Sequence, residues 1–129
     1  MPEAAALSVL VVDDQMAVRA LVKQSLANLG IKNVTDAADG EEALRRLQLN
    51  PAHLIISDLT MPRMDGLELL RQVRADPALK HVGFIMLTSR GEAELVKKAI
   101  ELKVNNYLTK PFAIGHLRKK IESVFGPLT

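Results

Sequence analysis

The sequence predicts an α/β fold, in which one parallel β-sheet carries helices on both of its faces. Five short apolar segments alternate with five segments in which apolar residues recur at helical spacing. Three of the apolar segments are continuous rather than alternating, which is typical of strands buried on both faces of a sheet. Strands that alternate with helices pair in parallel through right-handed crossovers. No repeat, linker or low-complexity tract interrupts the pattern, so we expect residues 1–129 to form a single domain with nothing appended to it.

The first half of the chain is expected to hold three strands and two helices. A helix is expected from Met16 to Leu29, because apolar residues recur there three or four positions apart and Gly30 follows as a stop signal. A second helix is expected from Glu41 to Leu49, and Asn50-Pro51 ends it. The apolar residues at helical spacing are Val18, Leu21, Val22, Leu26 and Leu29 in the first helix, and Leu44 and Leu47 in the second. The expected strands are Ser8–Val12, Val34–Ala37 and Leu54–Ser57.

The second half is expected to hold two strands and three helices. The third helix ends near Asp76-Pro77, because proline disfavours helical geometry in the residue before it. The apolar residues that mark the three helices are Leu67, Leu70 and Val73, then Leu95, Val96, Ala99 and Ile100, and finally Ile114, Leu117, Ile121 and Val124. The expected strands are Val82–Leu87 and Tyr107–Thr109.

Composition excludes several classes of function. The chain has no cysteine, so it has no disulfide, no thiol nucleophile and no thiolate metal site. Its formal net charge is only +2, which is too small to indicate a nucleic-acid partner. No apolar segment approaches membrane-spanning length, and the N-terminus lacks the pattern of a secretory signal. We therefore expect a cytoplasmic protein that binds neither nucleic acid nor a membrane.

Polar side chains follow the expected strands at the points where these strands end. Asp13 and Asp14 follow the first strand, Asp58 the third, Thr88 the fourth and Lys110 the fifth. Open α/β sheets bind ligands beyond the carboxyl ends of their strands. We therefore expect three carboxylates, one hydroxyl and one amine to converge at one edge of the sheet.

These residue types indicate chemistry with magnesium and a phosphoryl group. Three close carboxylates repel one another unless a cation is present, and all-oxygen ligation suits Mg²⁺ far better than zinc. Lys110 offers a positive charge to a phosphoryl oxygen, and Thr88 offers a hydroxyl donor. The chain contains neither GxxxxGK[ST] nor GxGxxG, so the phosphoryl group should arrive on another molecule rather than on a bound nucleotide. Asp58 is then the expected nucleophile, and an acyl phosphate is its product.

The same residues carry a family resemblance over about residues 8–125. The chain resembles the receiver domains of two-component response regulators, and among these it most resembles the stand-alone chemotaxis regulators. The matching segments are Asp13-Asp14, Asp58-Leu59-Thr60-Met61-Pro62-Arg63-Met64-Asp65-Gly66, Leu87-Thr88 and Lys110-Pro111-Phe112. The resemblance implies a flavodoxin-like (βα)5 fold with strand order 2-1-3-4-5.

The resemblance also implies a role for each residue of the site. Asp58 would accept a phosphoryl group from a sensor histidine kinase or from a histidine phosphotransfer protein. Lys110 would pair with the phosphoryl group, and its peptide bond to Pro111 would be cis. The residues implied to hold Mg²⁺, directly or through water, are Asp13, Asp14, Asp58 and the backbone carbonyl of Thr60.

A switch and an output surface are implied as well. Thr88 would move towards the phosphoryl group, and the Tyr107 ring would turn inward behind it. Thr60 and Arg90 occupy the two positions that flank the attacking water when such proteins lose the phosphoryl group. The residues expected on the output face, which a downstream protein such as a flagellar motor switch would read, are Ala93, Val96, Ile100, Tyr107 and Thr109.

Other interpretations of the sequence stay open at this point. A single-domain relay intermediate or a regulator of a kinase would use the same site. An aspartyl-phosphate phosphatase would need a second carboxylate, which Asp58-Leu59-Thr60 lacks. A flavodoxin-type cofactor binder is disfavoured because Asp13-Asp14 would repel a phosphate. We expect a monomeric signalling protein rather than an enzyme. The basic residues near the fourth and fifth helices form either a solvated face or a docking surface for an acidic partner; they are Lys97, Lys98, Lys103, Arg118, Lys119 and Lys120.

Overall fold

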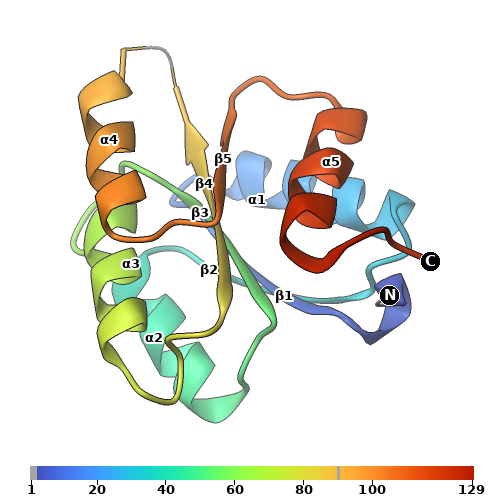
Figure 1. Ribbon diagram of the computed structural model, residues 1–129, viewed down its shortest axis with the longest axis horizontal. Coiled ribbons are helices and arrows are strands. Elements are labelled where there is room, and N and C mark those ends of the chain that lie inside the picture. Colours follow the sequence, from blue (N-terminus) through green and yellow to red (C-terminus); the bar gives the residue numbers. More distant parts are fainter. Residues whose placement is uncertain (1–2, 90) are drawn as a thin grey trace.

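A computed structural model of the protein describes residues 3–89 and 91–129. Within these residues, five parallel strands form one sheet in the order β2-β1-β3-β4-β5, which confirms the predicted fold and strand order (Figure 1). The strands are β1 (Ser8–Val12), β2 (Asn33–Ala37), β3 (Leu54–Asp58), β4 (Gly83–Thr88) and β5 (Asn106–Thr109). Their bounds agree with the sequence-based prediction to within one residue at each end.

Helices cover both faces of the sheet (Figure 1). They are α1 (Met16–Asn28), α2 (Gly40–Leu49), α3 (Gly66–Ala75), α4 (Ala93–Glu101) and α5 (Ile114–Phe125), preceded by a short 3-10 helix, η1 (Ala4–Ala6). Helices α1 and α5 pack on one face, and their side chains join one hydrophobic cluster. Helices α2, α3 and α4 pack on the other face and join a second cluster. The sheet therefore separates two aliphatic cores.

The burial of each strand follows from its place in the sheet. Every residue of β3 and β4 is buried, because these central strands contact helices on both faces. Strand β2 lies at one edge, and its side chains alternate between exposed and less exposed positions until Ala37. The continuous apolar segments Leu54–Ser57 and Val82–Leu87 thus correspond to central strands, as their pattern predicts.

Local chemistry fixes where several helices begin and end. The side chain of Asp39 caps α2 by accepting a hydrogen bond from the Glu42 amide at 2.9 Å, and Asp65 caps α3 by accepting one from the Glu68 amide at 2.9 Å. After α1, Gly30 has a φ of 87°, a left-handed conformation that glycine adopts without steric penalty.

One part of the predicted apolar pattern is wrong. The helical spacing groups Leu21 with the apolar residues of α1, but 56% of its surface is exposed. Helix α1 shares its face of the sheet with α5, so only a narrow stripe that includes Val22 and Leu26 is fully buried. By contrast, Ile100 in α4 is also 56% exposed but was expected on the output face of that helix.

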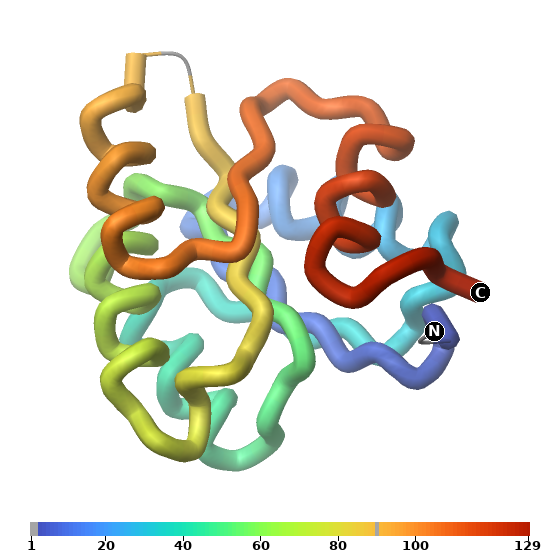
Figure 2. The backbone as a smooth tube through the Cα atoms, in the orientation of Figure 1, coloured from blue at the N-terminus to red at the C-terminus, as the bar shows by residue number. Residues whose placement is uncertain are grey.

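The two ends of the chain lie close together, as the tube in Figure 2 shows. The Ala4 amide donates a hydrogen bond to the carbonyl of Thr129 at 3.1 Å, and the Leu128 amide donates to the Glu122 carboxylate at 3.0 Å. These contacts close one end of the α1–α5 core. None of the helices in the described chain has both the length and the apolar character needed to cross a membrane.

Candidate functional site

Three carboxylates meet at the carboxyl edge of the sheet, as the sequence predicted. Asp58 is the last residue of β3, and Asp13 and Asp14 directly follow β1, which is the neighbouring strand. One oxygen from each of the three carboxylates lies within 4.8 Å of the other two. This spacing is short enough for one cation to contact all three groups.

Asp13 is the most deeply buried of the three. It has no exposed surface, and its Oδ1 atom accepts a hydrogen bond from the Gln15 amide at 2.8 Å. Its Oδ2 atom has no hydrogen-bond partner within the described residues, and the Lys110 Nζ atom is 3.8 Å away. Burial raises the pKa of Asp13, and repulsion from Asp58 acts in the same direction. A buried carboxylate oxygen without a partner is costly unless a cation or a donor supplies one.

Asp58 is held by one of its two carboxylate oxygens. Its Oδ1 atom accepts hydrogen bonds from Lys110 Nζ at 3.1 Å and from the Leu59 amide at 3.0 Å. In the part of the chain that the structure describes, the Oδ2 atom accepts none. Burial raises the pKa of Asp58, while its hydrogen bond and ion pair with Lys110 act in the opposite direction. The arrangement orients the carboxylate and leaves one oxygen available for a reaction.

Lys110 reaches this cluster from the end of β5. Its Nζ atom lies between two of the carboxylates, 3.1 Å from Asp58 and 3.8 Å from Asp13. The peptide bond between Lys110 and Pro111 is cis, as the family resemblance implied. The Lys110 ammonium group lies where it can neutralise negative charge on a group attached to Asp58.

Thr88 and Thr60 lie on the neighbouring strand end and loop. Thr88 is the last residue of β4 and is buried, and its hydroxyl oxygen is 3.4 Å from that of Thr109 on β5. Thr60 is exposed in the loop after β3, and its hydroxyl donates a hydrogen bond to Glu92 at 2.8 Å. Arg90, the predicted partner of Thr60 in dephosphorylation, lies outside the described residues.

Sequence reasoning missed Glu92. Its carboxylate accepts hydrogen bonds from the Thr60 hydroxyl and from the Ser89 amide, so it connects the loop after β3 to the loop after β4. The available signal was an acidic residue shortly before the apolar residues of the fourth predicted helix, where the helix dipole favours a negative charge. That signal indicates a helix start but not a contact with Thr60, which is 32 positions away.

The loop after β3 is fixed by further contacts that the sequence did not predict. Arg63 donates from its Nε atom to the buried carboxylate of Asp39 at 2.8 Å, and the Gly40 amide donates to the Met64 carbonyl at 3.0 Å. A Cβ atom added at Gly66 would lie 2.3 Å from the carbonyl oxygen of Asp58. Glycine at this position therefore lets α3 begin directly against the backbone of the candidate nucleophile.

The predicted output residues lie together around one groove. A hollow of about 500 Å³ between α4 and β5 is lined by all five of them and also by Thr88 at its inner end. These five residues are Ala93, Val96, Ile100, Tyr107 and Thr109. The Tyr107 side chain is partly exposed, at 39%. The groove thus extends from Thr88, at the carboxyl end of β4, to the outer surface.

The donor set fits a hard divalent cation. Three carboxylates, one of them with an orphaned buried oxygen, supply the oxygen ligands that Mg²⁺ prefers, and an exposed side of the cluster at Asp14 leaves room for water or for a phosphate oxygen. The chain offers no thiolate and no histidine in the cluster, so the set does not suit zinc.

Comparison with known proteins gives consistent matches over nearly the whole chain. The family model described as the response regulator receiver domain matches residues 9–122. The chain is 45% identical over 122 residues to the probable chemotaxis protein CheY of Rhizobium etli, covering 95% of each chain. It is 38% identical to the chemotaxis protein CheY of Pseudomonas aeruginosa, covering 92% of this chain and 96% of that protein.

Solved structures agree with these sequence matches. A putative response regulator from Chloroflexus aurantiacus superposes with a TM-score of 0.86 at 32% identity, covering 92% of this chain and 96% of that chain. The chemotaxis response regulator CheY4 of Vibrio cholerae superposes with a TM-score of 0.83 at 34% identity, covering 92% of this chain and 98% of that chain.

Proposed function

Because the chain belongs to the response regulator receiver domain family, we propose that it is a phosphoacceptor switch in two-component signal transduction, with Asp58 as the acceptor. One observation carries this proposal above the others. Asp58 is oriented through Oδ1 by Lys110 and by the Leu59 amide, while its Oδ2 atom accepts no hydrogen bond within the described chain. A nucleophile needs such a combination of a fixed position and a free oxygen.

In the proposed reaction, a carboxylate oxygen of Asp58 attacks the phosphorus atom of a phosphohistidine on a kinase or a phosphotransfer protein. The new bond is the P–O bond of an acyl phosphate, and the P–N bond to histidine breaks, so the electron pair and then a proton return to the imidazole. Lys110, whose Nζ atom lies 3.1 Å from Asp58, would stabilise the negative charge on the phosphoryl oxygens. Asp13, Asp14, Asp58 and the Thr60 carbonyl would hold Mg²⁺, which would supply positive charge to the phosphoryl oxygens.

We further propose that the output of the protein is a change on the face formed by α4, β5 and α5. Phosphorylation would draw the Thr88 hydroxyl away from Thr109, and the Tyr107 ring would then enter the space next to it. The relatives named as chemotaxis proteins favour a partner in chemotaxis or motility. The protein would act in the cytoplasm as a monomeric signalling protein, without turnover of its own substrate.

The experiment that tests this function is phosphoryl transfer from acetyl phosphate to the purified protein. We expect incorporation in the presence of Mg²⁺, strong loss when Mg²⁺ is chelated, and no incorporation in Asp58→Asn, whose amide is nearly isosteric but not nucleophilic. Asp76→Asn is the matched control, since Asp76 follows the C-terminal end of α3, where its carboxylate accepts a hydrogen bond from the Ala78 amide, and it should not affect the reaction. Normal incorporation into Asp58→Asn would show that Asp58 is not the acceptor.

A further inference from the structure

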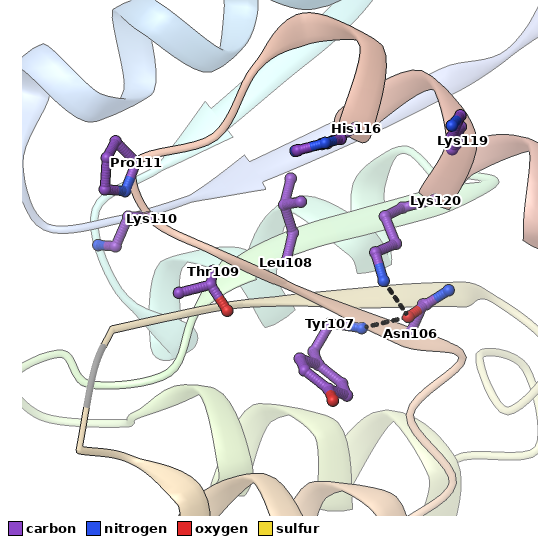
Figure 3. A pocket seen from close by; sticks show the side chains of 9 residues that line it. All are labelled: Asn106, Tyr107, Leu108, Thr109, Lys110, Pro111, His116, Lys119 and Lys120. Atoms are coloured by element: carbon purple, nitrogen blue, oxygen red, sulfur yellow. Dashed lines mark hydrogen bonds between the residues drawn. The ribbon is translucent and has the colours of Figure 1, made fainter.

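The partly exposed Tyr107 is contacted by two neighbouring side chains, Lys120 at its ring and Asn106 at its backbone. The Lys120 Nζ atom lies 5.4 Å from the centre of the Tyr107 ring, within the range of a cation–π interaction. The same Nζ atom donates a hydrogen bond to the Asn106 Oδ1 atom at 3.2 Å. That oxygen also accepts the backbone N–H of Tyr107 at 2.9 Å. Figure 3 shows both hydrogen bonds, from Lys120 and from the Tyr107 backbone, meeting at the Asn106 oxygen.

Asn106 is itself anchored to α5. Its amide nitrogen donates to the Ser123 hydroxyl at 2.9 Å, and Ser123 in turn donates to the Lys120 carbonyl. Asn106 therefore uses its oxygen for Lys120 and Tyr107 and its nitrogen for α5. The side chain fixes the position of the lysine as well as the start of β5.

The Tyr107 ring stands between two hollows. On the α5 side, a hollow of about 700 Å³ is lined by Tyr107 together with Lys120 and Asn106 (Figure 3). On the α4 side, the groove of about 500 Å³ is lined by Tyr107 and leads to Thr88. The structure thus offers the ring space on both sides, and the contact with Lys120 stabilises the partly exposed position that the ring occupies.

We infer that Asn106 and Lys120 are positioning residues that set the resting state of the switch, by stabilising the outward Tyr107 ring against the position near Thr88. This inference rests on the proposed function, because it concerns how that switch is biased. A cation–π contact at a partly exposed site changes the ratio of outward to inward rings by about two- to fivefold. Removing the contact should therefore raise the population of the inward ring by about that factor.

Thermodynamic reciprocity gives a test that needs no partner protein. If a phosphoryl group on Asp58 favours the inward ring, then a change that favours the inward ring must tighten binding of a phosphoryl mimic at Asp58 by the same free energy. The probe is beryllofluoride with Mg²⁺. Its binding can be followed by tyrosine fluorescence, because the chain has one tyrosine and no tryptophan, so the emission reports Tyr107 alone.

We expect Lys120→Met to bind beryllofluoride about two- to fivefold more tightly than the wild type. The direction of this change in affinity is informative, because loss of a positive charge by itself weakens the binding of an anion. Lys119→Met is the matched control: it removes the same charge from the same helix, and Lys119 has no ring contact or hydrogen bond with Tyr107 in the described structure. Lys120→Arg should restore wild-type affinity, since a guanidinium also interacts with an aromatic ring.

Asn106→Ala provides a second, independent variant and should shift affinity in the same direction as Lys120→Met. In a Thr88→Ala background, where the ring is uncoupled from Asp58, Lys120→Met should give no gain in affinity and should match Lys119→Met in the same background. Unchanged or weaker beryllofluoride binding in Lys120→Met, or an equal gain in Lys119→Met, would overturn the inference. A wild-type protein that fails to bind beryllofluoride at all would instead contradict the proposed function, so the two failures are distinguishable.

Discussion

At the scale of single residues, the buried carboxylates make the metal-free protein sensitive to pH. The pKa values of Asp13 and Asp58 are raised, in both cases chiefly by burial. The folded protein therefore binds these protons more tightly than the unfolded chain does. Such groups contribute stability below their unfolded pKa of about 4, and that contribution is lost as the pH rises through the folded-state pKa.

Replacing Asp13 with asparagine should remove the cost of burying its charged carboxylate. We expect metal-free Asp13→Asn to be more stable than the wild type near neutral pH by about 1–2 kcal/mol, and to be close to the wild type at a pH below about 4. The side-chain oxygen of the introduced amide can still accept the hydrogen bond from the Gln15 backbone N–H. Urea unfolding at both pH values, with Mg²⁺ chelated, measures the difference. A variant that is less stable than the wild type at neutral pH would contradict the account.

The pKa of Asp39 is shifted in the opposite direction, so Asp39 serves as the control. The Glu42 amide and the Arg63 side chain lower the pKa of Asp39. Its contribution to stability is therefore present above the unfolded pKa and is lost as the pH falls through the folded-state pKa. Asp39→Asn should destabilise the protein at neutral pH, whereas Asp13→Asn should stabilise it.

The sequence predicted which side chains converge at the edge of the sheet, but not all of the contacts that support them. Asp13, Asp58 and Lys110 could be predicted because each lies at the end of a strand of a parallel sheet, and such strands all end at one edge. Glu92 and Arg63 could not, because their contacts depend on loop conformation. Arg63 has a φ of 61°, a backbone state that no sequence pattern indicated.

At the scale of elements, the start of α3 determines how closely a helix can approach the candidate nucleophile. A Cβ atom at Gly66 would clash with the Asp58 carbonyl at 2.3 Å and with the Met86 sulfur at 2.8 Å. We expect Gly66→Ala to lower the free energy of unfolding by roughly 2–4 kcal/mol, because β3 or α3 must move. Phosphoryl transfer should fall with it, since Asp58 lies on the displaced segment.

Gly115→Ala is the matched control for that substitution. Gly115 lies in the first turn of α5, and a Cβ atom there has no neighbour within 4 Å. Alanine should stabilise the helix by up to about 1 kcal/mol. Thermal unfolding of both variants measures the contrast. A Gly66→Ala protein as stable as the Gly115→Ala protein would show that the close approach of α3 is not required.

Element bounds were predicted well where the sequence contains a stop or a cap. Gly30 and Pro77 follow α1 and α3, and the expected strands match the observed ones to within one residue at each end. The exposure of Leu21 was not predictable, because hydrophobic spacing does not reveal how much of the sheet face α5 already covers.

At the scale of the whole molecule, the proposed switch couples two regions of the structure. The carboxylate cluster lies beyond the carboxyl ends of the strands, and the output groove runs beside β5. Thr88 lines this groove from β4, which is the strand next to β3 and so next to Asp58. In the proposed switch, phosphorylation would need to change the relative free energy of the two Tyr107 ring positions by only a few kcal/mol to shift their populations.

Thr88→Ala should allow phosphorylation of Asp58 but prevent the change in the position of the Tyr107 ring. The variant keeps the nucleophile, the carboxylates and Lys110, so we expect it to accept a phosphoryl group at Asp58. Without the hydroxyl, the Tyr107 ring should respond little, and its fluorescence should change much less on addition of beryllofluoride and Mg²⁺ than in the wild type. A wild-type fluorescence change in Thr88→Ala would mean that the Thr88–Tyr107 coupling has to be abandoned.

The central claim is that Asp58 carries the phosphoryl group, and the most direct measurement locates that group in the chain. Borohydride reduces an acyl phosphate to an alcohol and so converts a phosphorylated aspartate into homoserine, which peptide mass spectrometry can place. After incubation with acetyl phosphate and Mg²⁺, we expect homoserine at position 58, and none when Mg²⁺ is chelated. Homoserine at position 13 or 14, or its absence from position 58 under conditions in which phosphate is incorporated, would contradict the account.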